Sequence, residues 1–328
     1  MNGMKSTLFL LVFLFGLFNP ELDAEIKKVA QTGYQFLKID TDARAAAMGG
    51  ANLMVGSGAN AIFYNPAGMT EQPASIDFFS TQTNWIADIS YFSLGISKNL
   101  GRFGFLGFSL QFSDYGQIIG TRVADNDVGF IETGNVSVGG SAFGISYAKK
   151  LTDQFAVGGQ VKFVSQNLGD TMMPDGMKTN KTDGLAYDFG TLYYPGLKSF
   201  RFGMGVRNFS KEFKYEDDPF TLPLTFTIGA ALDVTDFYGN LDEDHHLLLE
   251  ANAVHPRDYT ERINFGWEYG FRQFYLRGGY KFNHDTEGLS FGLGISLPVK
   301  NFKTRFEYSY NDAGDFEPVS RISLGFSL

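Results

Sequence analysis

The last forty residues of the chain alternate, almost without interruption, between large apolar side chains and small or charged ones. From residue 289 to residue 297, every odd position is Leu, Phe or Ile and every even position is Gly or Ser. Residues 305–310 and 321–328 repeat the pattern. A period of two places the two sets on opposite faces of a β-strand. Because the apolar face is large and aromatic, the pattern predicts strands with lipid outside and a polar lumen inside.

Runs of this kind extend back to about residue 75, and most are near the ~10 residues that a tilted strand needs to cross a bilayer. We count about fourteen, with approximate spans 75–81, 86–97, 103–112, 140–150, 154–166, 183–194, 198–208, 222–233, 245–254, 261–270, 273–282, 287–299, 302–310 and 319–328. An even number is expected of a bacterial single-chain barrel. The sequence therefore predicts an all-β fold, a transmembrane antiparallel β-barrel over residues 75–328.

The connections between the runs alternate between two kinds. The short ones are Lys98–Arg102, Thr152–Asp153, Pro195–Leu197, Phe271–Arg272 and Lys300–Asn301. The longer, more polar ones are Ser113–Gly139, Asn167–Thr182, Phe209–Thr221, His255–Thr260 and Asn311–Pro318. Outer-membrane barrels have short periplasmic turns and long external loops. We therefore expect both termini on the periplasmic side. One connection departs from the alternation of loop lengths: Val234–Asp244 is long and acidic but falls among the short turns.

Composition narrows the class of protein further. The 328 residues include 34 Phe and 16 Tyr, yet the mean hydropathy is only −0.11. After residue 25 there is no run of about 20 apolar residues, as a helical membrane protein would have. The net charge of −9 and the absence of a basic cluster argue against a nucleic-acid partner. The chain has no cysteine, which excludes disulfides, thiolate metal sites and a lipid-modified N-terminal cysteine.

The first 24 residues have the pattern of a secretory signal peptide. Lys5 supplies a positive charge, residues 8–18 form an apolar stretch, and Ala24 ends a plausible cleavage site. Eleven apolar residues are too few to span a membrane as an anchor. Residues 25–74 are not strand-like; Ala43–Ala51 predicts a short helix, and the glycines after it interrupt any regular element. We expect 25–74 to be a separate N-terminal segment of a protein exported to the bacterial outer membrane.

Charged side chains alternate with the lipid-facing ones and are therefore predicted to line the lumen. The candidate network is Lys162, Arg201, Arg207, Glu250, Glu268, Arg277, Arg305 and Glu307. Charges of both signs in a narrow lumen must pair with each other. We interpret the set as a structural network that fills the barrel; the alternative is a lining that selects a solute.

No pattern for catalysis, cofactor binding or metal binding is present. The four histidines are His245, His246, His255 and His284. The enzyme considered, an outer-membrane phospholipase, would need a Ser–His pair on the lipid-facing side, and no run provides one. The acidic stretch 242–244 lacks the ordered ligand spacing of a calcium site. We therefore predict no catalytic residues, no cofactor and no metal, and we expect that the protein is not an enzyme.

Two motifs lie in the N-terminal segment. Residues 36–51 read Phe-Leu-Lys-Ile-Asp-Thr-Asp-Ala-Arg-Ala-Ala-Ala-Met-Gly-Gly-Ala, and residues 63–69 read Phe-Tyr-Asn-Pro-Ala-Gly-Met. The first resembles the PorV/PorQ family of outer-membrane proteins. The second resembles FadL-like transporters generally. This resemblance implies a fourteen-stranded barrel whose N-terminal segment folds inward as a plug, with motif residues Asp42, Arg44, Met48, Gly49, Asn65, Pro66 and Gly68.

Elementary chemistry gives these plug residues structural roles. Asp42 could cap the alanine helix and favour its dipole, and Asn65-Pro66 favours a turn before the first strand. Arg44 is the one strong charge on the helix. We hypothesise that it pairs with a lumen acid: Glu250, Glu268 or Glu307. Packing and turn formation account for the motifs without a ligand, so a direct ligand role for Arg44 or Asn65 is the less favoured interpretation.

Two functions remain open. By the resemblance, the protein acts in type IX secretion, receiving secreted cargo through a C-terminal signal domain and delivering it at the cell surface together with a secretion translocon. Its contacts would then come from the external loops 113–139 and 167–182. Alternatively, it is a FadL-like channel that passes a hydrophobic small molecule, such as a fatty acid, into the membrane. Both functions place the barrel wall against outer-membrane lipid.

Overall fold

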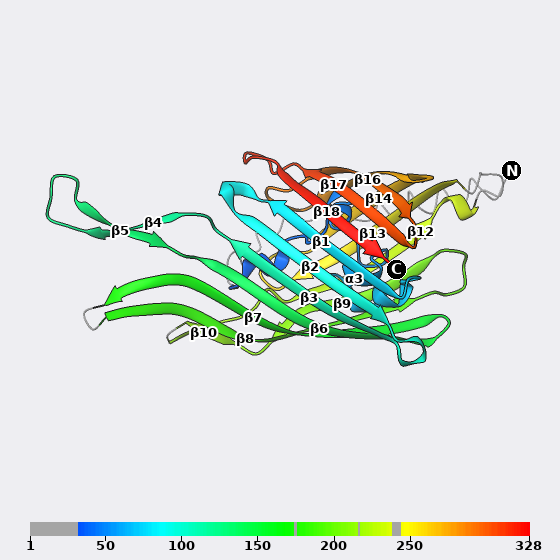
Figure 1. The fold of residues 1–328 in the computed structure, drawn as a ribbon, viewed down its shortest axis with the longest axis horizontal. Helices are drawn as coiled ribbons and strands as arrows, with labels where there is room; N and C mark the ends of the chain where they lie inside the picture. Colours follow the sequence, from blue (N-terminus) through cyan, green and yellow to red (C-terminus); the bar gives the residue numbers. More distant parts are fainter. Residues whose placement is uncertain (1–31, 174–175, 216, 238–243) are drawn as a thin grey trace.

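Fourteen antiparallel strands close into a barrel in the computed structural model, which describes residues 32–173, 176–215, 217–237 and 244–328 (Figure 1). In chain order the barrel strands are β1 (Ile76–Asn84), β2 (Ser90–Asn99), β3 (Phe105–Asp114), β6 (Gly139–Thr152), β7 (Phe155–Met173), β8 (Gly176–Tyr193), β9 (Arg201–Ser210), β12 (Thr225–Asp233), β13 (His245–Pro256), β14 (Arg262–Phe271), β15 (Phe274–Phe282), β16 (Leu289–Val299), β17 (Phe302–Asn311) and β18 (Val319–Ser327). The barrel closes where β1 pairs with β18. The fourteen predicted runs each correspond to one of these strands, so the predicted fold class is confirmed.

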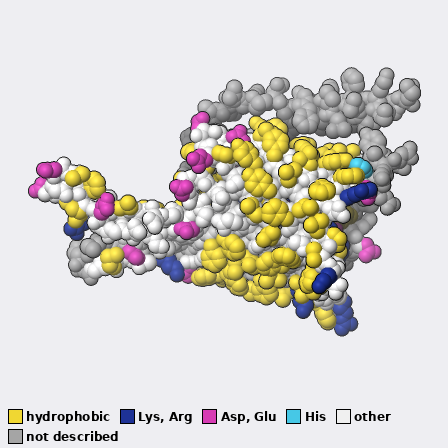
Figure 2. Space-filling view, turned by 45° about the horizontal axis from the view of Figure 1, so that its top comes forward, with side chains coloured by type: hydrophobic (Ala, Val, Ile, Leu, Met, Phe, Trp, Pro, Cys, Tyr) yellow, Lys and Arg dark blue, Asp and Glu magenta, His cyan; other side chains and the backbone are white. Residues whose placement is uncertain are grey.

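The two faces of the wall differ as the alternation requires. Leu293 is 60% exposed, whereas Arg277 on the neighbouring strand is only 2% exposed. Hydrophobic side chains cover a broad band of the outer wall, and basic side chains gather at the end that carries the short turns (Figure 2). A wall of this kind is stable only if lipid covers its outer face, since in water it would be a very large exposed apolar surface.

The long connections contain more strand than the sequence predicts. The segment 113–139 holds a hairpin of β4 (Ile118–Val123) and β5 (Phe130–Val136), and 209–221 holds β10 (Phe213–Tyr215) and β11 (Asp218–Phe220). The strands β7 and β8 continue as a hairpin through most of 167–182. In β4 and β5 apolar residues stand next to each other, as at Ile118 and Ile119. The period-two signal is therefore lost, although the backbone pairs as a sheet.

The N-terminal segment fills the barrel with short helices. These are η1 (Gln35–Lys38), α2 (Ala43–Ala47), α3 (Gly58–Ala61) and η2 (Pro66–Glu71); η3 (Ile86–Asp88), η4 (Gly101–Phe103) and η5 (Thr235–Phe237) lie in connections. The alanine helix is shorter than predicted, because Gly49 and Gly50 take φ of 65° and 75°, outside the helical region. None of the described helices is long and apolar enough to cross a membrane.

The described chain enters the barrel at one end and leaves at the other. Gly33 donates a backbone hydrogen bond to Thr221, in a long connection, so Thr32 and Gly33 lie at the loop end. Leu328 exchanges backbone hydrogen bonds with Ile76 at the end that carries the short turns. The predicted signal peptide, residues 1–24, and the N-terminus that would follow its removal lie outside the described residues.

Candidate functional site

The plug helix α2 fits against a part of the wall that glycines keep free of side chains. Ala43, Ala45, Ala46, Ala47 and Met48 have no exposed surface. A Cβ added at Gly279 on β15 would lie 2.2 Å from the backbone of Met48 and Gly49, and one at Gly292 on β16 would lie 2.4 Å from Ala47. Alanines on the helix and glycines on the wall therefore let the two backbones approach closely. The backbone of the predicted motif residues Met48 and Gly49 lies directly at this contact, and Gly49 has a φ of 65°.

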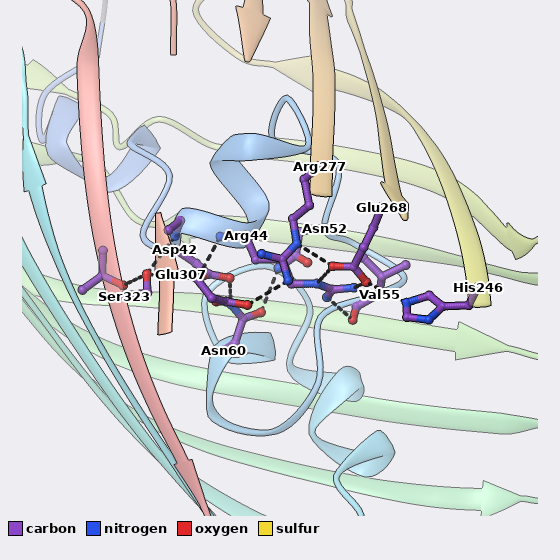
Figure 3. Close-up of polar contacts among 12 residues, drawn as sticks. Asp42, Arg44, Asn52, Val55, Asn60, His246, Glu268, Arg277, Glu307 and Ser323 are labelled. Atoms are coloured by element: carbon purple, nitrogen blue, oxygen red, sulfur yellow. Dashed lines mark hydrogen bonds and ion pairs between the residues drawn. The ribbon is translucent and has the colours of Figure 1, made fainter. Parts of the chain in front are cut away.

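Arg44 of α2 lies at the centre of an ion-pair network (Figure 3). Its Nε and Nη2 donate to the two carboxylate oxygens of Glu268, at 2.7 and 2.9 Å, and its Nη1 donates to the carbonyl of Val55 at 2.8 Å. Of the three acids considered from the sequence, Glu268 is therefore the partner. The paired geometry is the bidentate arrangement that makes an Arg–carboxylate contact strong.

A second arginine extends this network across the wall. The Nε of Arg277 donates to Glu268 at 2.5 Å, and its Nη2 donates to Glu307 at 2.9 Å. His246 lies 3.7 Å from Glu268 on the turn side. The chain Arg44–Glu268–Arg277–Glu307 thus links the plug to β14, β15 and β17, and all four side chains are largely buried.

Asp42 caps α2 as predicted and also holds the plug to the wall. Its carboxylate accepts from the backbone N–H of Arg44 at 3.2 Å, from Asn60 of α3, and from Ser323 of β18 at 3.3 Å. Burial, together with the nearby charge of Glu307, raises the pKa of Asp42 to about 6. The plug therefore carries a carboxyl that titrates near neutral pH.

Asn65 and Pro66 form the turn at the end of the plug. The Asn65 Oδ1 accepts from the backbone N–H of Ala67 at 3.1 Å, and its Nδ2 donates to the carbonyls of Leu53 and Thr191 at 3.1 and 3.0 Å. Pro66 occupies the first turn of η2. A Cβ at Gly68 would lie 2.5 Å from the carbonyl oxygen of Gly56. All polar groups of the Asn65 amide are used within the chain, so this motif has the character of a structural turn.

The other predicted lumen charges also point inward, but they form separate groups. Lys162 pairs with Asp188 at 2.8 Å, and Arg305 pairs with Asp77 at 2.8 Å. Three more contact the plug backbone: Arg201 donates to the carbonyl of Met54, Arg207 donates to that of Phe63, and Glu250 accepts from the N–H of Met54. The eight candidates therefore act as wall-to-plug contacts and local pairs rather than as one continuous network.

Several acidic partners of these charges, among them Asp188 and Asp77, are not among the predicted residues. Asp188 alternates with Tyr187 and Phe189, so the period-two rule alone would have placed it in the lumen. Asp77 lies in the first run, 75–81, where the next inward residue is the buried Phe79 and the alternation is therefore obscured.

A second group of charges holds the plug at the loop end. Asp40 pairs with Lys281, which also pairs with Glu287, each at 2.9 Å, and Lys38 pairs with Asp258 at 3.1 Å. Burial acts to raise the pKa of Asp40, but Lys281 and Arg321 outweigh it and lower that pKa. The plug is therefore held by ion pairs of Lys38 and Asp40 as well as by that of Arg44.

Among the described residues, the lumen holds two large cavities. One of about 660 Å³ lies at the turn end, bounded by Arg44, Asp77, Arg277 and the β16–β17 turn. The other, of about 410 Å³, lies at the loop end; aromatic residues such as Tyr64, Trp85 and Tyr115 and charged residues such as Lys281 and Glu287 both line it. Both are within the range of small-molecule sites. Among the described residues no group of three or more His, Asp or Glu side chains is arranged to hold a metal ion.

Comparison with solved structures identifies related barrels. The toluene transporter TbuX of Ralstonia pickettii matches with 14% identity and a TM-score of 0.55, covering 88% of this chain and 98% of that one. The toluene transporter TodX of Pseudomonas putida matches with 13% identity and a TM-score of 0.58, covering 87% and 97%. At these identities the likeness shows the fold alone.

Comparison of sequences points to one family. The family described as "Type IX secretion system protein PorV" matches residues 22–251, which is more than half of the chain and includes both plug motifs. No curated protein matches the sequence.

Proposed function

The chain belongs to the PorV family of type IX secretion system proteins, and from this premise we propose that it acts in the delivery of secreted proteins to the cell surface. In this proposal the short turns face the periplasm and the long hairpins face outward. Secreted cargo, carrying a C-terminal signal domain, and components of a translocon would contact the external hairpins. The same proposal includes a signal peptide over residues 1–24, a plug over 25–74 and a barrel over 75–328. It also includes that the protein catalyses no reaction.

The observation that carries the proposal is the β4–β5 hairpin, which projects from the loop end of the barrel (Figure 1). Its side chains are exposed on both faces: Ile119 is 58%, Val123 89% and Val128 70% exposed. A two-stranded hairpin without further packing is marginally stable in water, and exposed apolar residues of this kind mark an interaction site. The hairpin therefore has the features of a segment that a protein partner covers.

The filled lumen supports the same conclusion. The plug is held by the Arg44–Glu268 and Lys281–Asp40 ion pairs and by glycine-mediated contacts with the wall. Breaking a buried ion pair costs about 3–5 kcal/mol, so moving the plug to open a path requires a strong driving force. A barrel with a fixed plug and a projecting hairpin suits contact with proteins at its outer end better than free passage of solute.

Affinity isolation from the native envelope tests the proposal. The wild-type protein is expected to co-purify secreted proteins that share a C-terminal domain, and the variant Ile119→Ser/Phe130→Ser is expected to lose them. The matched control, Thr121→Ser/Thr133→Ser, changes the same two strands and removes only one methyl group from each. It is expected to retain the secreted proteins. Co-purification that is the same with all three proteins would contradict the proposal.

A second candidate function, a channel for hydrophobic solutes, draws on the cavity at the loop end, where Tyr64, Trp85, Tyr91 and Tyr115 offer aromatic surface among charged residues. Uptake of a monoaromatic hydrocarbon or a fatty acid by cells that produce the protein distinguishes the two. Uptake above that of cells without the protein, together with no protein partner, would favour the channel.

The proposed sidedness has its own test. The C-terminus lies at the turn end, so a C-terminal tag should be inaccessible to antibody in intact cells. The position of the N-terminus stays a prediction: the described chain starts at Thr32, which lies at the loop end.

A further inference from the structure

The cavity at the loop end of the lumen has a basic wall and an aromatic wall, and neither candidate function uses the basic one. Its volume of about 410 Å³ is within the range of small-molecule sites. Each residue that lines it lies in the plug, in a connection, or on the lumen-facing side of a strand. The cavity therefore belongs to the interior of the barrel and is open to a ligand from the loop end.

Two arginines, Arg207 of β9 and Arg262 of β14, form the basic wall. Both are only partly buried, and neither has an ion pair among the residues that the structure describes. The two acidic residues of the lining, Asp40 and Glu287, both pair with Lys281. A charge in an enclosed site without a partner is unfavourable, so the two guanidiniums favour an anion in this cavity.

The other titratable groups around the cavity do not cancel this charge. Lys38 pairs with Asp258 at 3.1 Å. His284 also lines the cavity, but burial, together with the charge of Lys281, lowers the pKa of His284 to about 3, so its ring is neutral. Four cations thus face three carboxylates, and the arginines of the basic wall are the two cations without an ion pair.

The pairing register places the two arginines at nearly the same level of the wall. Arg207 lies opposite Thr225 of β12, which lies opposite Pro256 of β13. Arg262 lies opposite Val254, two residues before Pro256. Neighbouring strands are about 4.8 Å apart, so the arc from β9 through β12 and β13 to β14 is narrow. A ligand in the cavity therefore meets both arginines.

The side chains of Trp85, Tyr91 and Tyr115 form the aromatic wall. They come from the β1–β2 connection, from β2 and from the segment after β3. The rings of Trp85 and Tyr91 meet edge to face, with 5.9 Å between their centroids. Around the barrel, β15–β18 separate this wall from the basic wall in one direction, and β3, β6, β7 and β8 separate them in the other. The two walls therefore face each other across the lumen.

We propose that this cavity binds a small aromatic acid. Its carboxylate accepts hydrogen bonds from Arg207 and Arg262, and its ring packs against the aromatic wall. Guanidinium groups suit carboxylates in geometry and charge, and contacts between aromatic rings add to the binding that buried area provides. The site goes beyond the proposed secretion function. Its ligand differs from a hydrocarbon by its charge and from a fatty acid by its ring.

Calorimetric titration of the purified full-length protein in lipid nanodiscs tests the site. The probe is phenylacetate, and two matched compounds remove one feature each: phenylacetamide lacks the charge, and cyclohexylacetate lacks the aromatic face. Phenylacetate is expected to bind at least about tenfold more tightly than phenylacetamide and about two- to tenfold more tightly than cyclohexylacetate. No binding of phenylacetate, or equal affinity for it and either matched compound, would overturn the proposal.

Arg262→Gln tests the basic wall without removing a contact to the plug. The Arg262 guanidinium lies 4.1 Å from the centre of the Tyr259 ring and has no hydrogen bond among the described residues. Affinity for phenylacetate should fall at least about tenfold, while stability against denaturant stays close to that of the wild type. The control Arg257→Gln removes the same charge from an exposed position outside the cavity lining. Unchanged affinity in Arg262→Gln, or an equal loss in both variants, would contradict the proposal.

Tryptophan fluorescence reports where the ligand binds. The chain has two tryptophans. Trp85 belongs to the aromatic wall, whereas Trp267 lies on the lipid-facing side of β14. In the variant Trp267→Phe, phenylacetate should change the emission of Trp85 with the dissociation constant that calorimetry gives. Binding that leaves this emission unchanged would place the ligand outside the cavity and refute the assignment.

Discussion

Glu268 is the carboxylate on which the plug-to-wall network most depends. It accepts two hydrogen bonds from Arg44 and one from Arg277. Glu268→Gln therefore leaves the buried guanidinium of Arg44 without its charge partner and leaves Arg277 with Glu307 alone. Removing one partner of a buried pair costs about 3–5 kcal/mol. Arg44→Met should cost less, because Glu268 retains Arg277. We predict that Glu268→Gln loosens the plug more than Arg44→Met does.

Hydrogen exchange followed by mass spectrometry measures this loosening directly, since local opening sets the exchange rate of peptides from residues 36–69. A cost of about 3 kcal/mol corresponds to roughly a hundredfold faster exchange. The control Lys162→Met breaks another buried pair, Lys162–Asp188, between two wall strands away from α2. Because Lys162 borders plug residues such as Leu37 and Phe63, the comparison is made on peptides that contain α2, where Lys162→Met should leave exchange unchanged. Equal or slower plug exchange in Glu268→Gln than in Arg44→Met would refute the network described here.

Three further predictions concern the plug. The raised pKa of Asp42 means that the folded protein binds more protons than the unfolded chain between about pH 4 and pH 6. The contribution of protonated Asp42 to stability is therefore present at low pH and lost as the pH rises to about 6. The difference in plug exchange between wild type and Asp42→Asn should change across this range. A constant difference would contradict the assignment. Asn65→Ala removes the cap of η2 and two further hydrogen bonds, so the free energy of opening this segment should fall by about 2–4 kcal/mol and η2 should become sensitive to protease at lower denaturant concentration. An unchanged proteolysis profile of this segment would argue against this role. Gly279→Ala places a methyl group against the plug backbone and should speed plug exchange, whereas Gly159→Ala, whose Cβ would meet its nearest neighbour at 3.5 Å, should not.

The barrel could be predicted from the sequence because its wall repeats one physical rule. Each strand must present apolar residues to lipid and polar or small ones to the lumen, so period-two alternation identifies all fourteen strands. The rule fails where no lipid enforces it. In β4 and β5 both faces are exposed, adjacent positions such as Phe130 and Ile131 are both apolar, and the hairpin is hidden in the pattern.

The site could be predicted only in part. Alternation shows that Glu268 and Arg277 face inward, but not that both meet Arg44, because the path of the plug through the lumen depends on long-range packing. The glycines illustrate the same limit: Gly279 and Gly292 look like ordinary small lumen residues, and only the position of α2 gives them their role. Acidic partners such as Asp40 and Asp77 belong to segments without clear alternation, so no local signal marks them.

The central claim is that a plugged barrel presents the β4–β5 hairpin to proteins of the secretion pathway. A photo-crosslinking amino acid at Val123, near the tip of the hairpin, tests this most directly in living cells of the native host. Lys198, in a short turn at the opposite end, is the control position. The claim predicts cross-links from Val123, and not from Lys198, to secreted proteins with a common C-terminal domain or to an outer-membrane translocon. No protein cross-link from Val123, or the same products from both positions, would contradict it.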